Sequence, residues 1–246
     1  MIEGTPFSPA TAGWFDAVFE SPTPAQTRGW KAIADGTHTL IHAPTGSGKT
    51  LAAFLWSLDT LMTSPAPPAT SGCRVLYVSP LKALAYDVDR NLRAPLTGIR
   101  AEAMKLDLET TDISVAMRTG DTPQKERQAM VRNPPDLLIT TPESLYLMLT
   151  SRAREILTTV ETVIIDEIHS LAGTKRGAHL ALSLERLDEL ATTSPQRIGL
   201  SATQRPLEVI AEFLGGGTAT EDTWTPRPVT IIDAPMDKEL DVEIVV

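Results

Sequence analysis

The stretch HTLIHAPTGSGKT, residues 38–50, decides the fold of this 246-residue chain. It begins with a short apolar run, turns at Gly46 and Gly48, and ends with Lys49 and Thr50 at the start of a long apolar segment. This order predicts a strand, a phosphate-binding loop and a helix. In such a loop, backbone amides and the helix N-terminus bind phosphate oxygens, the lysine contacts the outer phosphates, and the threonine hydroxyl is a ligand of Mg²⁺. The stretch therefore predicts a nucleotide site.

The first position of this loop departs from the usual pattern. G-x-x-x-x-G-K-[ST] begins with glycine, whereas this chain has Ala43 there. The position needs a small residue where the strand ends, and alanine meets that need. We therefore expect the whole loop to bind the phosphates, through Thr45, Gly46, Ser47, Gly48, Lys49 and Thr50.

Composition and charge narrow the class of protein. No apolar run reaches the roughly 18 to 20 residues that cross a bilayer, and no signal peptide is evident, so we expect a cytoplasmic protein without a membrane partner. A single cysteine, Cys73, excludes internal disulfides and thiolate metal clusters. The 22 Lys and Arg residues against 31 Asp and Glu give a net charge of −9, whereas nucleic-acid-binding domains are more often basic. Any contact with nucleic acid is therefore expected to be local, or shared with chain outside this sequence.

Apolar segments and helical segments alternate along the chain. Short runs rich in β-branched residues occur at 38–43, 73–79, 113–119, 136–141, 162–167 and 197–202. Residues 51–62 and 180–193 instead carry apolar residues at helical spacing. Strands that are apolar almost throughout are buried on both faces, so we predict a doubly wound, mostly parallel α/β sheet with helices on both faces. Residues 63–72 are predicted to be a surface loop without chemistry, and 215–231 a loop that leads to an edge strand.

A pair of carboxylates, Asp166 and Glu167, ends the apolar run TVII. This places them at the carboxyl end of a strand, where open α/β sheets bind their ligands. Asp166 can hold Mg²⁺, while Glu167 can orient and deprotonate an attacking water. Alternation along the strand is expected to point the two side chains in different directions. Alone, such a pair is most often a solvated strand end, but the phosphate loop upstream favours the catalytic interpretation.

Three motifs in this order carry a family resemblance: APTGSGKT (43–50), DEIH (166–169) and LSAT (200–203). They resemble the first RecA-like domain of superfamily-two helicases of the DExH-box class. Secondary motifs agree, at SPLKALAYD (79–87), RTGDT (118–122) and TTPESL (140–145). The longer stretch DEIHSLAGTKRGAHLALSLERL resembles the large helicase-related (Lhr) proteins in particular, with the wider Ski2-like group as the next-best match. The similarity extends over nearly the whole chain.

The resemblance implies roles for individual residues. Gln26, in PTPAQ, would bind the adenine edge through paired hydrogen bonds. His169 would relay the state of the γ-phosphate, and Ser201 and Thr203 would link the nucleotide site to the nucleic-acid groove. Backbone contacts to nucleic acid are expected from Pro80, Lys82, Thr119, Gly120, Asp121, Thr141 and Pro142, with a basic pair at Lys175 and Arg176. Because Asp121 is anionic, we expect it to brace its loop.

The resemblance also implies an activity and partners. It predicts an ATP- and Mg²⁺-dependent motor that moves 3′ to 5′ along single-stranded DNA and unwinds duplexes or RNA:DNA hybrids, in DNA repair. Residues 1–35 would form N-terminal helices with the adenine motif, 36–233 the ATP-binding RecA-like domain, and 234–246 the start of a linker. A second RecA-like domain of the same polypeptide would complete the ATP site with arginines. The isolated chain is therefore expected to bind nucleotide weakly and to be nearly inactive.

Other functions fit parts of the pattern. A small-molecule or nucleotide kinase would share the phosphate loop, but it would lack LSAT and would normally carry an arginine-rich lid, which we do not find. An RNA-directed DExH helicase remains open, because the expected contacts are to the backbone and do not separate DNA from RNA. A nucleotide-gated nucleic-acid-binding module also remains, although the intact Lys49, Asp166 and Glu167 favour an enzyme.

Overall fold

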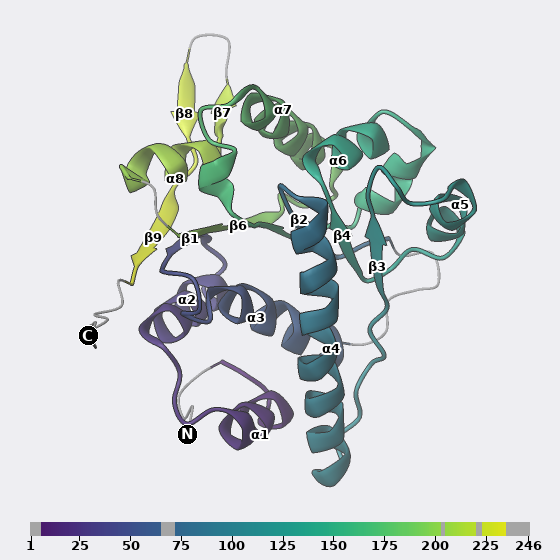
Figure 1. The fold of residues 1–246 in the computed structure, drawn as a ribbon, viewed down its shortest axis with the longest axis vertical. Coiled ribbons are helices and arrows are strands. Elements are labelled where there is room, and N and C mark those ends of the chain that lie inside the picture. Colours follow the sequence, from purple (N-terminus) through teal and green to yellow (C-terminus); the bar gives the residue numbers. More distant parts are fainter. Residues whose placement is uncertain (1–5, 65–71, 203–204, 220–222, 235–246) are drawn as a thin grey trace, which may run out of the picture.

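A sheet of seven parallel strands forms the centre of the molecule (Figure 1). The computed structural model describes residues 6–64, 72–202, 205–219 and 223–234. The strands of the sheet are β1 (His38–His42), β2 (Val75–Val78), β3 (Val115–Arg118), β4 (Leu137–Thr140), β5 (Thr162–Ile165), β6 (Gln196–Ser201) and β9 (Val229–Asp233). They lie in the order β3-β4-β2-β5-β6-β1-β9, and every neighbouring pair is parallel. All six predicted strands are therefore present.

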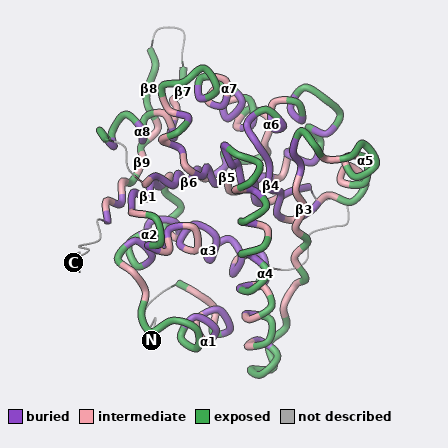
Figure 2. The backbone as a smooth tube through the Cα atoms, viewed as in Figure 1, coloured by how far each residue is buried: buried purple, intermediate pink, exposed green. Residues whose placement is uncertain are grey.

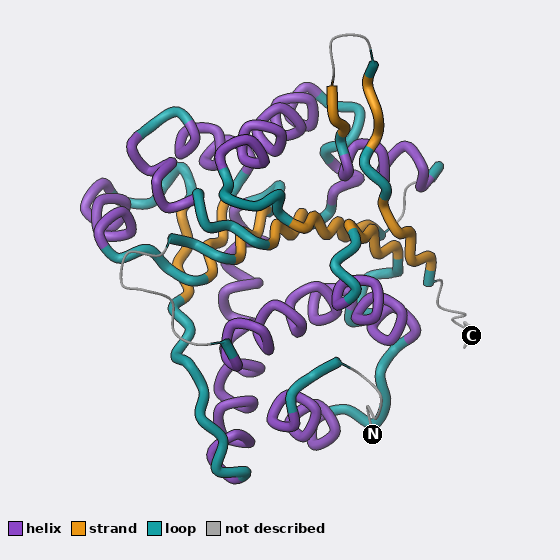
Figure 3. Tube along the Cα trace, turned by 180° about the vertical axis from the view of Figure 1, so that it is seen from behind, coloured by secondary structure: helices purple, strands orange, loops and turns teal. Residues whose placement is uncertain are grey.

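Helices cover both faces of the sheet, as Figures 1 and 3 show from opposite sides. One face carries α2 (Pro24–Ala34), α3 (Lys49–Thr63) and α4 (Lys82–Lys105), with α1 (Pro9–Val18) packed against α4. The other face carries α6 (Pro142–Leu149), η1 (Arg152–Leu157), η2 (Ile168–Ser170), α7 (Lys175–Leu190) and α8 (Leu207–Gly215). Helix α5 (Gln124–Arg132) lies at the β3 end. The doubly wound α/β prediction is confirmed.

The segment before β9 departs from the prediction. It contains a two-stranded antiparallel hairpin of β7 (Gly217–Ala219) and β8 (Trp224–Pro226), where we expected a plain loop. Three-residue strands in a segment rich in glycine and proline give no periodic signal. The edge strand itself is present, because β9 pairs with β1 at the margin of the sheet.

The helices that border the predicted site begin at specific caps. Helix α2 begins with a capping box, in which Thr23 accepts from the Gln26 amide and the Gln26 side chain accepts from the Thr23 amide. Helix α3 follows Gly48, whose φ of 77° is left-handed, a conformation that side chains disfavour. Helix α6 is capped by the Thr141 hydroxyl and has Pro142 in its first turn, where a missing N–H costs nothing. The caps fix where each loop meets its helix.

The core consists of apolar layers above and below the sheet, and much of the sheet is coloured as buried in Figure 2. Leu138 and Leu184 belong to the layer under α6, α7 and α8, and Phe54 belongs to the layer under α2, α3 and α4. A third cluster, which includes Trp14 and Trp30, joins α1 and α2 to α3 and α4. The N-terminal helices therefore share their apolar core with the sheet's own helices.

Some expectations fall on residues that the structure does not describe. Helix α3 ends at Thr63, and residues 65–71 of the predicted surface loop lie outside the described residues. So does nearly all of the predicted linker, since only Ala234 of 234–246 is described. Within the described ranges, no helix has the length and apolar character needed to cross a membrane.

Candidate functional site

The phosphate loop lies between the carboxyl end of β1 and the start of α3. Its first residue, Ala43, donates its amide to the carbonyl of Ser201 at 3.0 Å, which ties the loop to the neighbouring strand β6. Gly46 and Gly48 have φ angles of 82° and 77°, so the chain turns back on itself and the amides at the start of α3 stay open. Lys49 is buried, with 6% of its surface exposed. These are the features that a phosphate cradle requires.

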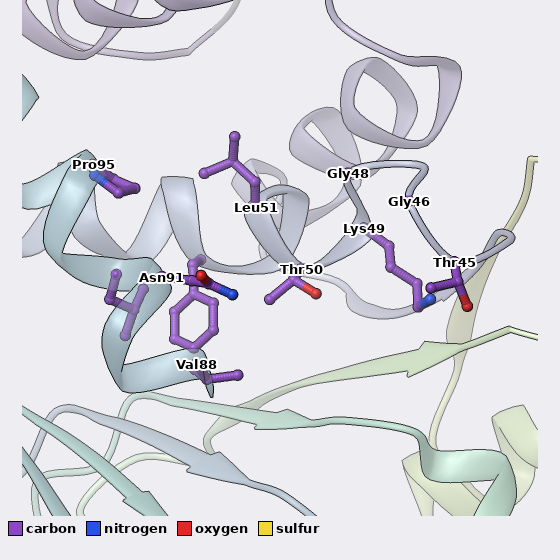
Figure 4. A pocket seen from close by; sticks show the side chains of 11 residues that line it. Thr45, Gly46, Gly48, Lys49, Thr50, Leu51, Val88, Asn91 and Pro95 are labelled. Carbon is purple, nitrogen blue, oxygen red and sulfur yellow. The ribbon is translucent and has the colours of Figure 1, made fainter. Parts of the chain in front are cut away.

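A cavity of about 370 Å³ lies against this loop (Figure 4). The loop and the first turns of α3 form one wall, which includes Lys49, Thr50 and Phe54. Helix α4 forms the other wall, through Val88 and Asn91 among others. The phosphate-loop motif therefore lines one wall of this cavity, whereas Gln26, Asp166 and Glu167 are not among its lining residues.

Gln26 contacts the loop from the other side. Its Oε1 accepts from the Thr23 amide at 2.9 Å, and its Nε2 donates to the Gly48 carbonyl at 3.5 Å. The Thr23 hydroxyl donates to the Ser47 carbonyl at 2.8 Å, which fixes the loop to the start of α2. A carboxamide has two acceptor and two donor positions, so one acceptor and one donor of Gln26 remain. An adenine edge, with an amino group beside a ring nitrogen, offers the matching pair.

The two carboxylates follow β5 directly, with the Asp166 amide bonded to the carbonyl of Val78 on β2 at 2.9 Å. Asp166 is buried, whereas Glu167 is half-buried. Strand alternation, which we expected to separate their side chains, does not apply to this pair. Strand β5 ends at Ile165, and Glu167 has a left-handed φ of 43°, so a turn separates the side chains instead of strand alternation.

Glu167 lies between a lysine and a histidine. Its Oε1 is 4.0 Å from Lys49 Nζ, and its Oε2 is 3.4 Å from His169 Nε2. The ammonium of Lys49 is thus near a carboxylate at the place where phosphates would lie. A γ-phosphate beside Lys49 would place its attacking water next to Glu167.

Unpartnered buried polar atoms gather around this site. In the part of the chain that the structure describes, they include Ser47 Oγ, His169 Nδ1 and Ser201 Oγ. Buried polar groups normally have hydrogen-bond partners, and exceptions indicate a bound molecule or a catalytic role. Ser201 also accepts the Ala43 amide through its carbonyl, so the predicted coupling residue contacts the phosphate loop. The other coupling residue, Thr203, lies outside the described residues.

Tyr77 is a site residue that the sequence did not reveal. It lies on β2 opposite Ile164 of β5, so Asp166, two residues further along, is its diagonal neighbour on the same face. Phe54 stacks on its ring with centroids 4.8 Å apart. Burial, and then the negative charge of Asp166, raise the pKa of Tyr77 well above its usual value. The hydroxyl therefore keeps its proton and can donate a hydrogen bond to the Asp166 carboxylate.

The predicted nucleic-acid contacts come together at one edge of the sheet. Pro80 follows β2, Thr119–Asp121 follow β3, and Thr141 and Pro142 follow β4. Because these three strands are neighbours in the order β3-β4-β2, their carboxyl ends form one continuous row. Lys82 joins two of the loops through an ion pair with Asp121 at 2.6 Å. This pair fits the bracing role expected of Asp121.

Arg176 also ties this edge together. It donates to the Pro80 carbonyl at 2.9 Å and to Glu143 Oε1 at 2.7 Å. Partial burial is the largest single influence on Glu143 and opposes its ionisation, but the hydrogen bonds from Arg176, the backbone and Thr141, together with the charge of Arg176, outweigh it, and the pKa of Glu143 lies below its usual value. Arg176 is thus engaged within the protein, whereas its neighbour Lys175 is exposed at the start of α7.

Arg127 on α5 is a second residue that the sequence did not reveal. Its Nε donates to the Thr122 carbonyl at 2.7 Å, and its Nη2 donates to the carbonyls of Gly120 at 2.8 Å and Thr119 at 3.3 Å. One guanidinium therefore holds the backbone of the whole loop after β3. Only the fold brings this side chain to the loop, so no motif signals it.

A further contact lies at the other edge of the sheet, beside the phosphate loop. His42 Nδ1 is 2.9 Å from Asp233 Oδ1, and Arg205 donates to Asp233 Oδ2 at 2.7 Å. The hydrogen bond with His42, and then that with Arg205, hold the pKa of Asp233 below its usual value. This contact joins the end of β1 to the end of β9.

Comparison with known families and proteins agrees with this geometry. Residues 23–210 match the family model described as DEAD/DEAH box helicase. The chain is 58% identical over 238 residues to the Lhr helicase/probable uracil glycosylase of Mycolicibacterium smegmatis, covering 97% of this chain and 15% of that protein. It is 54% identical over 245 residues to the Lhr helicase/uracil glycosylase of Escherichia coli, covering 98% and 15%. The chain thus spans less than a fifth of these relatives.

Solved structures give the same result. The helicase Lhr of Mycobacterium smegmatis, solved bound to ssDNA and AMP-PNP, superposes with a TM-score of 0.85 at 59% identity, covering 93% of this chain and 28% of that one. The predicted RecA-like helicase fold and the predicted similarity to the Lhr proteins are both confirmed.

Proposed function

The chain belongs to the DEAD/DEAH box helicase family, and on that premise we propose that it is the first motor domain of an ATP-dependent helicase that moves along single-stranded DNA. The observation that carries the proposal is the meeting of Lys49, Asp166, Glu167 and His169 at the carboxyl ends of β1 and β5, beside unpartnered buried polar atoms. A phosphate site and a water-activating carboxylate in contact are what ATP hydrolysis requires.

We assign a separate role in ATP binding and hydrolysis to each residue of the site. The open amides at the start of α3 and the ammonium of Lys49 bind the β- and γ-phosphates. Glu167 accepts a proton from the attacking water, since its carboxylate is half-buried and lies 4.0 Å from Lys49. His169, 3.4 Å from Glu167, orients that carboxylate and senses its charge. Gln26 selects adenine with the donor and acceptor that its capping box leaves open.

Mg²⁺ fits the residues at the end of β5. This ion keeps several waters and takes few protein ligands beside substrate phosphates. The chain offers the buried carboxylate of Asp166 and the hydroxyl of Thr50. Within the described residues, no group of three or more His, Cys, Asp or Glu could form a protein-only metal cage. When bound, the ion would neutralise charge that develops on the phosphates.

The nucleic-acid track follows the loops after β2, β3 and β4. Backbone groups and hydroxyls there can hold phosphates without reading sequence. The similarity to a helicase solved with ssDNA supports DNA as the strand. We extend the proposal to 3′ to 5′ movement and to unwinding of duplexes or RNA:DNA hybrids. A second RecA-like domain of the same polypeptide would supply arginines to the γ-phosphate, which is supported by the small share of the relatives that this chain spans.

The test is steady-state ATP hydrolysis by the full-length protein, with single-stranded DNA, with single-stranded RNA and without either. We expect stimulation by DNA, and a fall of about 100-fold or more in Glu167→Gln with nucleotide binding retained, because a general base is lost while its shape remains. The control is Glu212→Gln, which removes the same charge from the exposed surface of α8. Stimulation by RNA alone would make the protein an RNA-directed helicase, and hydrolysis by Glu167→Gln near the parent rate would remove the role of Glu167.

A further inference from the structure

A second, larger hollow lies between α5, the end of α6 and η1, with a volume of about 950 Å³. Four arginines line it: Arg118, Arg127, Arg132 and Arg152. Glu155 is the one acidic residue of its lining, and it is 4.0 Å from Arg152. We call this place the arginine hollow. Its positive charge contrasts with the net charge of −9 of the chain, so it is a strongly basic patch on an acidic protein.

Arg118 forms the buried part of the arginine hollow. Only 8% of its surface is exposed, and its Nη1 is buried without a hydrogen-bond partner. Among the described residues, no carboxylate pairs with its guanidinium. Burial, and then the positive charge of Arg127, lower the pKa of Arg118, yet a guanidinium stays charged at neutral pH. A buried, unpaired charge is unfavourable and is normally matched by a counter-charge.

The other arginines are arranged around this buried charge. The Nε and Nη2 groups of Arg127 donate hydrogen bonds to the loop after β3. Its Nη1 group makes no hydrogen bond within the described residues. Arg132 and Arg152 are exposed. Planar guanidinium groups bind phosphate through paired N–H donors. The hollow thus combines a buried cation with exposed cations around it, which suits a ligand that enters from solvent and carries negative charge.

We propose that the arginine hollow binds phosphate groups of the nucleic-acid strand on which the motor acts. The proposal rests on the proposed function, because it extends the nucleic-acid edge past the loop after β3. Arg118 immediately precedes Thr119 of that loop, and Arg127 holds the loop's carbonyls. A volume of about 950 Å³ is far larger than one phosphate ion needs, so an extended polyanion fits better than a single ion. A free phosphoanion has the same chemistry and is separated by the experiment.

The first arm measures binding of a single-stranded oligonucleotide by the full-length protein with a non-hydrolysable ATP analogue, over a range of salt concentrations. Arg118→Gln is expected to weaken binding about tenfold. The slope of the logarithm of the binding constant against the logarithm of the salt concentration should also become shallower, by about 0.7 for each phosphate contact that is lost. The matched control is Arg93→Gln, which removes an exposed arginine of α4 that pairs with Asp89; it should change neither quantity.

A second variant guards against misfolding of Arg118→Gln. Arg132→Gln with Arg152→Gln changes exposed side chains only, and it should weaken strand binding and lower the salt dependence in the same sense. Its control is Arg93→Gln with Arg100→Gln, two exposed arginines of α4 whose partners are Asp89 and Asp112. Equal strand binding by the hollow variants and their controls would exclude the strand as the ligand.

The second arm uses inorganic phosphate and pyrophosphate, with the ATP site already filled by the analogue. Binding to the hollow raises the unfolding temperature of the parent protein by mass action, and this rise should shrink in the hollow variants but not in the controls. If phosphate or pyrophosphate raises the unfolding temperature in this way, but the hollow variants bind the strand as tightly as their controls, the ligand of the arginine hollow is a free phosphoanion. If the parent protein binds no strand at all, the proposed function fails while this arm still decides on the hollow. No difference in either arm overturns the inference.

Discussion

Replacement of Gly48 by alanine tests how closely the phosphate loop and the adenine contact are joined. Gly48 has a φ of 77°, and a Cβ added there would lie 2.5 Å from Gln26 Nε2. The left-handed conformation costs an alanine about 1 to 2 kcal/mol. The contact would displace the Gln26 side chain, and with it the hydrogen bond from the Thr23 amide, at about another 1 kcal/mol. We therefore expect Gly48→Ala to lower the free energy of unfolding by about 2 to 3 kcal/mol.

Gly36 supplies the matched control. It has the same φ of 77°, but a Cβ there would meet nothing within 4 Å. Gly36→Ala should therefore show the conformational cost of about 1 to 2 kcal/mol alone. The difference between the two variants isolates the contact with Gln26. In a Gln26→Ala background this difference should vanish, because the displaced side chain is no longer present.

Two assays read the outcome. Urea unfolding gives the free energies, and equilibrium binding of ATP and GTP analogues gives the base preference. Gly48→Ala should lose the preference for adenine along with stability, whereas Gly36→Ala should keep it. If Gly48→Ala is no less stable than Gly36→Ala, or still prefers ATP as strongly as the parent, the described link between the loop and Gln26 is wrong.

Three more outcomes are expected. Lys49→Ala should weaken binding of an ATP analogue by roughly tenfold or more at any Mg²⁺ concentration, whereas the binding defect of Asp166→Ala should shrink as Mg²⁺ is raised. Titration of both variants with the analogue at two Mg²⁺ concentrations measures this, and an equal response of the two variants to Mg²⁺ would contradict the roles given to Lys49 and Asp166. Asp233→Asn should be less stable than the parent at neutral pH. The pKa of Asp233 is lowered in the folded state, so its carboxylate contributes stability above its ordinary pKa, and that stability is lost as pH falls through the folded pKa. The difference in free energy of unfolding between the two proteins should therefore shrink steadily as pH is lowered in acid unfolding experiments. The isolated chain should bind ATP but show almost no turnover with or without single-stranded DNA, and robust DNA-stimulated hydrolysis would contradict the missing-arginine proposal.

The sequence predicted the parts of the molecule that depend on local pattern. Continuous apolar runs identified the parallel strands, and the spacing of Gly46, Gly48 and Lys49 identified the phosphate loop. Asp166 was expected at a strand end, and strand ends meet at one side of a parallel sheet. These inferences need no knowledge of strand order, which is why they could be made.

Other parts depend on which elements become neighbours. Tyr77 faces Asp166 only because β2 lies beside β5, and Arg127 reaches the loop after β3 only because α5 folds back beside it. The direction of Glu167 follows from a left-handed turn that a strand pattern cannot indicate. The hairpin of β7 and β8 was hidden because its strands are too short for periodicity.

The position of β1 has a consequence for how the domain is made. This strand precedes the phosphate loop, yet its partners are the late strands β6 and β9, with His42 opposite both Ser201 and Asp233. During synthesis β1 therefore waits for nearly the whole domain before it can pair, and such distant pairing slows folding. A version that stops before β9 would keep the phosphate-loop motif but leave β1 as an open, apolar margin. We expect that version to aggregate as it is produced, because β9 is the strand that covers this margin of β1.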